Sequence, residues 1–383
     1  MGPENATTKN LLEWLNQRAD LAKNSTRIRM RKIVFLTAFI IIILIYYFGA
    51  LEYITVLTLK RKIPDGVNHP RAPLCYNVPQ ENYDPEIPTL PGHKVTPNSI
   101  FFLDTSCSHG YGVNLSLRQA CAYESAARAH PQSQVLVLFP SPISLDEPSP
   151  VVTVLLTYEN LKFVRILEEN FFNRTPLETF RFYEKIAGSS FPESHASDIL
   201  RLAILWKYGG TYLDSDVIVC RRLNGMKNFA GAESDKLING AVLNFDKTKK
   251  SKLIIEEMVK KIQENFQPTL WTKNGPEVLT DVLSRLCNET DLTKISRARC
   301  GGFSVFPPPP RSPFYPIAYW DWEALFTAPS DPSFVKYLAT RSTVHFWNKM
   351  SKSSPVDVRS NVPFNLLAAR FCPRIHSIAT DHF

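Results

Sequence analysis

Several common patterns are missing from this sequence of 383 residues. Its seven cysteines include no CxxC pair and no Cys/His spacing typical of a zinc site. No nucleic-acid-binding motif accompanies the net charge of +8, so we expect a soluble surface, an anionic ligand or an anionic membrane rather than nucleic acid. No internal repeat indicates a solenoid. With 44% hydrophobic and 21% charged residues, the composition is that of a globular protein.

Charge is missing altogether from the segment between Ile33 and Leu51. About 20 apolar residues can cross a bilayer as one helix. A secretory signal peptide is the alternative, but its apolar core would be shorter and nearer the N-terminus. Basic residues crowd positions 27–32, which favours a cytosolic N-terminus. We therefore predict a cytosolic tail at 1–32, a transmembrane signal anchor at 33–51, and a luminal remainder.

The predicted luminal part begins with a proline-rich stretch, which is typical of an extended stem, over 52–97. A compact domain should then occupy 98–383. Sequons at Asn114, Asn173 and Asn288 fit a luminal placement. Disulfides are expected there, and Cys287 and Cys300 are the first candidate pair because they are close in sequence. Two buried free thiols are the alternative for these cysteines.

The compact domain is predicted to have an α/β fold. Apolar runs at 100–103 and 135–139 predict buried strands, and 118–129 has a helical pattern. The order of strand, helix and strand is the signature of a parallel sheet. Ligands of such sheets bind beyond the carboxyl ends of the strands, so candidate site residues should be sought there.

The most informative stretch runs from Ser197 to Val219. We expect Ser197 to cap a helix that ends at Gly209 and Gly210, and a short strand to follow at 211–213. Asp214 and Asp216 would stand at its carboxyl end. Two carboxylates on one face of a strand repel each other unless they share a cation or one of them holds a proton. A divalent cation with oxygen ligands resolves the conflict, although a polar turn or a calcium-stabilised loop has the same pattern.

Asp198 and Arg201 are three residues apart on the predicted helix and so lie on the same face of it. One interpretation is a surface ion pair of small energy. The other is that the helix start faces the crevice, where Arg201 would bind phosphate or donor hydroxyls and Asp198 a sugar hydroxyl. The pattern by itself favours neither interpretation.

With these motifs the sequence resembles the alpha-1,4-glycosyltransferase family, and most closely its galactosyltransferase branch. The match follows the same order along nearly the whole predicted luminal domain. The residues that carry it are Glu124 to Pro131, Ser197-Asp198 with Arg201, Gly209 to Asp216, Asn239-Gly240-Ala241, Gly275-Pro276, Phe314 to Trp322, and Val344 to Lys349.

The resemblance implies a GT-A, Rossmann-like mixed sheet flanked by helices, with a UDP-sugar donor, Mn²⁺ or another divalent cation, retention of anomeric configuration, and Golgi residence. It implies a metal site of Asp214, Asp216 and His345, although a lone histidine between aromatic residues is as often a core residue. The catalytic residues would be Asp214, Asp216, Asp198 and Arg201. The donor would be bound by Asp198, Arg201, Asp214, Asn239, Gly240, Trp347 and Lys349.

An aromatic segment near the C-terminus could bind the acceptor. Tyr319, Trp320 and Trp322 could form a platform for sugar rings, or could pack as a rigid loop against the core. Beyond the cation ligands, Glu233 and Asp235 are the spare acids that could take part in a double displacement.

The predicted reaction transfers galactose or N-acetylgalactosamine from a UDP-sugar in alpha-1,4 linkage to a glycan, favouring a glycosphingolipid. The alternatives are an alpha-1,4-N-acetylglucosaminyltransferase acting on glycoprotein glycans, a haloacid-dehalogenase-like phosphohydrolase in which Asp214 attacks phosphorus, and a non-catalytic lectin. Release of UDP in a metal-dependent reaction separates these classes.

Overall fold

The computed structural model describes residues 74–77, 84, 87–90, 94–109, 112–166, 171–223, 225–295, 299–327 and 331–383. The predicted tail at 1–32, the anchor at 33–51 and most of the stem at 52–97 therefore lie outside the described residues. Among the residues that are described, no helix has the length and apolar character needed to span a membrane. All of them belong to one compact unit, His69–Phe383.

A mixed sheet of eight strands, in the order β3-β2-β1-β4-β7-β6-β9-β8, forms the centre of this unit. Strands β1 to β4 pair in parallel, whereas β7 runs antiparallel to its neighbours β4 and β6. A further two-stranded sheet pairs β5 with β10. The strands are β1 Ile100–Leu103, β2 Val135–Phe139, β3 Leu161–Arg165, β4 Gly210–Leu213, β5 Val217–Val219, β6 Phe229–Ala232, β7 Ile238–Phe245, β8 Arg299–Cys300, β9 Phe303–Phe306 and β10 Thr343–His345.

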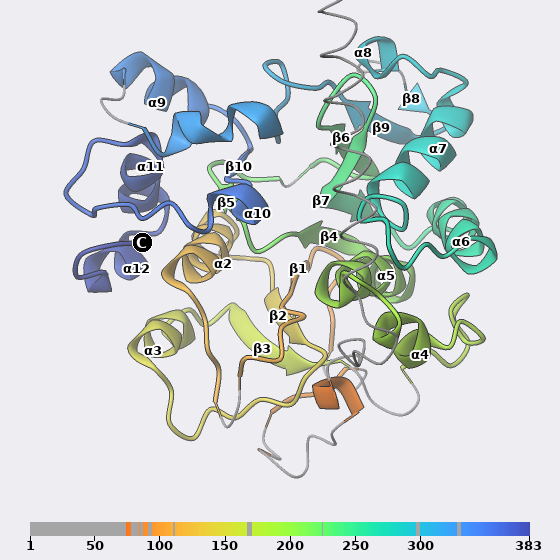
Figure 1. Ribbon diagram of the computed structural model, residues 1–383, viewed down its shortest axis with the longest axis horizontal. Coiled ribbons are helices and arrows are strands. Elements are labelled where there is room, and N and C mark those ends of the chain that lie inside the picture. The colour runs from red at the N-terminus through yellow and green to blue at the C-terminus, as the bar shows by residue number, and fades with distance from the viewer. Residues whose placement is uncertain are drawn as a thin grey trace, which may run out of the picture. The chain divides into compact units, whose positions relative to one another are not determined.

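Helices cover both faces of the large sheet (Figure 1). One apolar core lies between the sheet and α2, α3, α11 and α12, and the other lies between the sheet and α4 to α7. The helices are η1 Leu74–Asn77, α2 Leu117–Ala129, α3 Pro150–Leu156, α4 Phe182–Ala187, α5 Pro192–Tyr208, α6 Lys249–Glu264, α7 Pro276–Cys287, α8 Leu292–Ile295, η3 Tyr319–Leu325, α9 Pro332–Ala339, α10 Asn348–Ser351, α11 Pro363–Phe371 and α12 Pro373–Ile378. The prediction of a mixed α/β architecture with flanking helices is confirmed.

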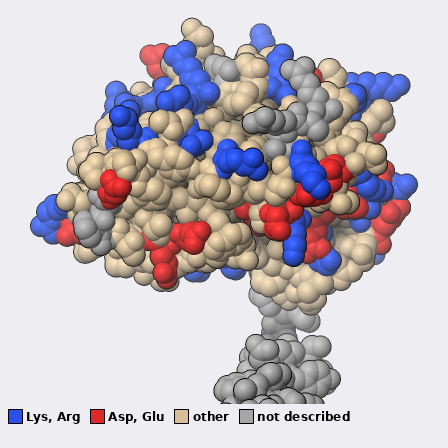
Figure 2. All heavy atoms as spheres, turned by 90° about the horizontal axis from the view of Figure 1, so that it is seen from above, with Lys and Arg blue, Asp and Glu red and all other residues tan. Residues whose placement is uncertain are grey.

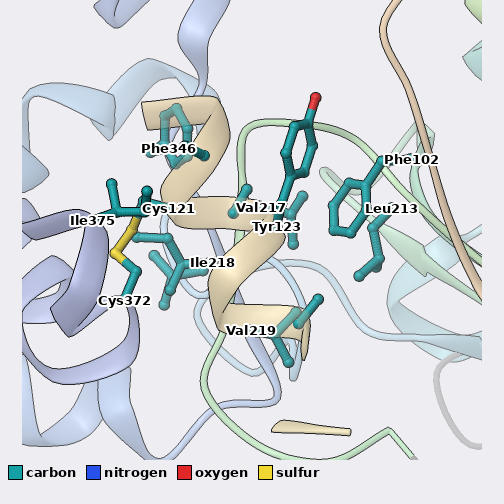
Figure 3. Close-up of a cluster of buried hydrophobic side chains, with 14 of the residues drawn as sticks. Phe102, Cys121, Tyr123, Leu213, Val217, Ile218, Val219, Phe346, Cys372 and Ile375 are labelled. Carbon is teal, nitrogen blue, oxygen red and sulfur yellow. A yellow bond between two sulfur atoms is a disulfide. The ribbon is translucent and has the colours of Figure 1, made fainter. Parts of the chain in front are cut away.

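Helix α2 joins the sheet to the C-terminal helices. It begins at a capping box in which the Ser116 hydroxyl accepts from the Gln119 amide. Figure 3 shows side chains of α2 packed between β5 and α12, where a disulfide links Cys121 of α2 to Cys372, the residue between α11 and α12. The Ser125 hydroxyl also accepts a hydrogen bond from the Val219 amide at 2.9 Å. Helix α2 thereby holds strand β5, which follows the Asp-Ser-Asp turn.

The predicted start of the long helix is wrong. Helix α5 begins at Pro192, five positions before Ser197, because proline suits the first turn of a helix, where its missing N–H costs nothing. The Ser197 side chain therefore does not cap the helix but contacts Tyr212. The predicted end at Gly209 is confirmed, and β4 starts at Gly210.

Three disulfides are formed, Cys75–Cys107, Cys121–Cys372 and Cys287–Cys300. The predicted pair is confirmed, and the seventh cysteine, Cys220, remains a thiol. The side chains of Asn114, Asn173 and Asn288 are all exposed, as glycosylation would require. On the face shown in Figure 2, basic and acidic side chains lie in small groups separated by uncharged surface.

Candidate functional site

Asp214 and Asp216 lie in the turn that connects β4 to β5, at the carboxyl end of β4. The turn is held by a hydrogen bond from the Val217 amide to the Asp214 carbonyl at 3.1 Å, and by one from the Asp214 amide to the Ala241 carbonyl at 2.9 Å. The strand argument for a shared face is therefore wrong, because the two residues are not in a strand. The turn nevertheless brings their carboxylates to the same side.

Asp216 is fixed by the C-terminal part of the chain. In the β5–β10 ladder His345 pairs with Val217, which places its Nε2 2.9 Å from Asp216 Oδ1. The Asn348 amide donates to Asp216 Oδ2 at 2.9 Å. Burial alone would raise the pKa of Asp216, but the charge and hydrogen bond of His345 outweigh it and lower this pKa. Burial alone would lower the pKa of His345, but Asp216 raises it above the ordinary value.

Asp214, Asp216 and His345 together fit a divalent cation. Each offers one ligand atom, and these atoms lie within 4.8 Å of one another. Protein ligands sit about 2.0–2.6 Å from Mg²⁺ or Ca²⁺, so two ligands of one ion are at most about 5 Å apart. Carboxylate oxygens suit Mn²⁺, and imidazole is a common ligand of transition metals. Buried Nδ1 of His345 has no partner among the described residues, so one nitrogen of the ring is uncommitted.

Asp214 is held by helix α5 through Arg201. Two residues share one nitrogen of the guanidinium: Nη1 donates to the Gly240 carbonyl at 2.7 Å and lies 3.2 Å from Asp214 Oδ1. Nε donates to the Ser197 carbonyl, while Nη2 donates to the Ser197 hydroxyl and lies 3.1 Å from Asp198 Oδ1. Of the two interpretations left open, the surface ion pair is wrong, because both Arg201 and Asp198 are buried.

Asp198 stands directly against the start of α7. A Cβ atom at Gly275 would come within 2.4 Å of its carboxylate, so only glycine leaves room at that position. Burial raises the pKa of Asp198 to about 7, an effect that Arg201 opposes and Asp214 adds to. The carboxyl group is thus poised between a hydrogen-bond donor and an acceptor near neutral pH.

The predicted donor residues of β7 lie beside this network. The Asn239 side chain accepts from the Ala241 amide at 2.6 Å and donates to Glu233. Gly240 has a steric role, since a Cβ there would lie 2.7 Å from Arg201 Nη1. The Gly240 carbonyl accepts from the Arg201 guanidinium, and the absence of a side chain leaves room for it. A contact between Gly240 and the sugar donor remains a prediction.

Trp347 and Lys349 follow His345 on the other side of the turn. Trp347 is buried, stacks edge-on against His345 at a centroid distance of 4.0 Å and donates to the Ile317 carbonyl. Lys349 is exposed, with Nζ 5.4 Å from the Trp271 ring and 5.7 Å from the Phe191 ring. Among the described residues no carboxylate forms an ion pair with Lys349, so its charge is available to an anionic ligand.

The aromatic residues of η3 divide into two groups. Tyr319 and Trp320 are 46% and 59% exposed, and Tyr319 contacts Trp347. Trp322 is only partly exposed and packs against Phe326 and the core. The exposed pair fits the predicted platform, whereas Trp322 fits the alternative of a packed loop.

Two contributors to this site had no role in the sequence interpretation. Tyr212 donates to Asp214 Oδ1 at 2.6 Å, and its ring lies under the Arg201 guanidinium. Its position two residues before Asp214 in the strand is the signal that could have identified it. Tyr315 is buried, with its ring 5.8 Å from that of His345. Of the two spare acids, Glu233 is buried beside Asn239, and Asp235 is exposed.

Comparisons with known proteins define the class first. A family model described as "Glycosyltransferase sugar-binding region containing DXD motif" matches residues 116–237, which include the Asp-Ser-Asp turn. A model described as "Alpha 1,4-glycosyltransferase conserved region" matches residues 247–379, which include His345 and Lys349. Both matched segments contribute side chains to the cluster around Asp216.

Individual relatives then give the family. Human lactosylceramide 4-alpha-galactosyltransferase is 33% identical over 79% of this chain and 83% of its own length. Human alpha-1,4-N-acetylglucosaminyltransferase is 28% identical over 67% of this chain and 74% of its own. A solved galactosyltransferase, LgtC with donor and acceptor sugar analogs, shares 18% identity with a TM-score of 0.39 over 74% of this chain and 96% of its own. On the sequence relationships, this chain belongs to the alpha-1,4-glycosyltransferase family and is a hexosyltransferase.

Proposed function

We propose that this enzyme transfers galactose or N-acetylgalactosamine from a UDP-sugar, with retention, in alpha-1,4 linkage to the glycan of a glycosphingolipid. The observation that carries the proposal is the cluster of Asp214, Asp216 and His345, assembled from two segments that both match glycosyltransferase families. The glycolipid acceptor is supported by the relatives named lactosylceramide 4-alpha-galactosyltransferase.

The chemistry follows from the positions of the charges. A divalent cation, which we propose to be Mn²⁺, would be held by the cluster and would supply positive charge for the departing diphosphate. Lys349 is exposed on α10, shortly after His345 in the chain, and can add a second positive charge to the phosphates. Asp198 can bind a sugar hydroxyl, and the exposed rings of Tyr319 and Trp320 can pack on the acceptor.

Retention requires no dedicated base if substitution occurs on one face, with the departing phosphate oxygen taking the proton of the acceptor hydroxyl. The GT-A type of fold belongs to the same proposal. It is supported by the mixed sheet covered by helices and by the acidic turn at the carboxyl end of β4. The phosphohydrolase and lectin alternatives have no support from the family assignment.

The alternative that retains support is alpha-1,4-N-acetylglucosaminyl transfer to glycoprotein glycans, because one relative bears that name. One experiment tests both functions. The full chain, purified in detergent, is supplied with Mn²⁺ or a chelator, with each of three UDP-sugars, and with a glycolipid or a glycoprotein glycan. We expect metal-dependent UDP release and an alpha-1,4-linked product with a glycolipid. A beta linkage contradicts retention, and transfer of N-acetylglucosamine alone favours the alternative.

We also propose a single-pass type II placement in the Golgi membrane, with the catalytic domain in the lumen. Three disulfides and three exposed sequons support an oxidising, glycosylating compartment. Protease treatment of sealed microsomes tests the proposal. Protection of the domain at 98–383, together with glycan attached at Asn114, Asn173 or Asn288, is expected, and digestion from outside would contradict it.

A further inference from the structure

Glu233 follows β6 at the same edge of the sheet as the Asp-Ser-Asp turn. Strand β7 runs antiparallel to both β4 and β6, so β4 and β6 point in the same direction and their carboxyl ends coincide. Asp214 follows the first of these ends, and Glu233 follows the second. Strand β7 lies between these two strand ends. On one side the Ala241 carbonyl accepts from the Asp214 amide, and on the other side Asn239 pairs with Gly231 of β6.

Within the described part of the chain, the carboxylate of Glu233 is bound by protein at one oxygen only. The Asn239 amide donates to Oε2, and among the described residues no hydrogen bond reaches Oε1. Asn239 is itself immobilised, since its own carbonyl oxygen accepts from the Ala241 amide at 2.6 Å. Glu233 is thus oriented by a rigid partner and retains a second oxygen for another donor.

Glu233 lies at the same sheet edge as the Asp-Ser-Asp turn without belonging to the cation cluster. Its charge acts on His345 and on the buried Tyr315, and both of those groups also interact with Asp214. The group that could hold a cation, among the residues described, comprises Asp214, Asp216 and His345 but not Glu233. Hydrogen bonds connect Glu233 through Asn239 and Ala241 to the Asp214 amide, so a carboxylate that is not a ligand of the cation is held at this edge and is available to another hydrogen-bond donor.

Burial makes this arrangement costly for the folded protein. Glu233 is 9% exposed, and no Lys or Arg of the described residues forms an ion pair with it. Burial raises its pKa, while the hydrogen bond from Asn239 and the charge of His345 oppose that rise. One neutral amide does not replace the water that a carboxylate loses, and such uncompensated acids concentrate at functional sites.

We propose that Glu233 is a sugar-binding residue whose free Oε1 accepts a hydrogen bond from a hydroxyl of the hexose at the Asp214–Asp216–His345 site. This inference rests on the proposed function and deepens it. The hydroxyl belongs either to the transferred sugar or to the acceptor sugar that receives it, and the same experiment separates these two sources. No bond to Glu233 is formed or broken, and its negative charge additionally favours the positive charge that develops on the transferred sugar.

The test compares Glu233→Gln with Asp235→Asn. Glutamine keeps the size and a carbonyl oxygen for Asn239, but it loses the charge. Hydrogen bonds to a charged group contribute about 1.5–3 kcal/mol, so kcat/KM should fall roughly tenfold to a hundredfold. Asp235 lies two residues further on and is exposed, so Asp235→Asn should stay within about twofold of the parent by the same reasoning. UDP carries no hexose, and its metal-dependent affinity should be equal in all three proteins.

The kinetic constants identify the source of the hydroxyl. A contact with the transferred sugar weakens binding of the intact UDP-sugar relative to UDP, whereas a contact with the acceptor raises the KM of the acceptor alone. A folded Glu233→Gln protein with normal kcat and both KM values normal overturns the inference, as does a loss of UDP affinity as large as the loss of activity. If the parent protein transfers no sugar, the proposed function fails, and the ratio of UDP-sugar to UDP affinity still decides the role of Glu233.

Discussion

The two carboxylates of the Asp-Ser-Asp turn are neutralised in different ways. Asp214 faces α5 and pairs with Arg201, whose guanidinium is permanently charged and is shared with Asp198, Ser197 and Gly240. Asp216 faces β10 and pairs with His345, whose imidazole, unlike a guanidinium, also has a neutral form. The α5 side is therefore a framework around a permanent positive charge, whereas the positive charge on the β10 side depends on the protonation of His345.

This difference suggests a division of roles within the turn: Arg201 holds the Asp214 side in place, and the His345 side is the one that a cation would change. Metal ligands must be deprotonated, so a cation held at the β10 side would require His345 in its neutral form. On the α5 side, five acceptor atoms of the protein surround the guanidinium: Ser197 O and Oγ, Gly240 O, Asp198 Oδ1 and Asp214 Oδ1. Changes on the β10 side should thus affect activity most, and changes on the α5 side should affect stability as well.

The largest effect is expected for Asp216→Asn. The amide keeps the size of the side chain and can still accept from His345, but it removes a charged ligand. Loss of that charge should raise the barrier by several kcal/mol, which corresponds to a rate roughly a thousandfold lower. Turnover, Mn²⁺ binding and thermal melting without metal are measured together. Near-normal turnover in a folded variant would reject the cation site.

Arg201→Lys should lower stability, which Asp216→Asn should not. A single ammonium cannot reach acceptors on four residues, so part of this network, which includes the buried carboxylate of Asp198, loses its partner, at a cost of about 3 kcal/mol. For a compact unit that spans His69–Phe383, this cost corresponds to a fall in melting temperature of roughly 4–5 °C.

The control for this variant is Arg285→Lys. Arg285 forms ion pairs with Asp281 and Glu257, but its side chain is 54% exposed, so the substitution should cost well under about 1 kcal/mol. Equal melting temperatures for the two variants would mean that the Arg201 network is not a framework.

Local patterns in the sequence predicted strands β1, β2 and β4 and the position of the two aspartates at the carboxyl end of β4. Strands β1 and β2 have the predicted bounds because each is an uninterrupted apolar run in the parallel part of the sheet. The start of α5 was mistaken because Ser197, a good capping residue, competed with the proline signal at Pro192. Cys287 and Cys300 were paired correctly since the chain between them is short.

Local sequence patterns could not predict contacts between segments that are far apart in the chain. Cys121 and Cys372 are separated by 251 positions, and the packing of α11 and α12 on α2 brings them together. His345 reached the predicted site through family resemblance, and its place follows from the register of β10 on β5. The different surroundings of Glu233 and Asp235 depend on where β6 ends, which their shared acidity does not reveal.

The smallest predicted effect is on the pH dependence of the free energy of unfolding, and it arises from Asp198 on the α5 side. Burial raises its folded-state pKa to about 7, whereas in the unfolded chain it has the ordinary value near 3.8. Between these two values the folded state binds more protons than the unfolded chain, so the stability that this proton provides falls as the pH rises to and through 7. From about pH 6 to pH 8 the parent should lose about 1.4 kcal/mol relative to Asp198→Asn, which has no proton to lose.

Chemical denaturation at both pH values, in the presence of a chelator and without donor, measures this difference. Asp235→Asn serves as the matched control, because that carboxylate is exposed and its removal should leave the pH dependence of the parent unchanged. If the free energies of unfolding of Asp198→Asn and the parent differ by the same amount at both pH values, the guanidinium of Arg201 holds Asp198 ionised throughout. The α5 side would then be a framework of fixed charges alone, and its contrast with the protonatable Asp216–His345 pair would be sharper than the raised pKa of Asp198 implies.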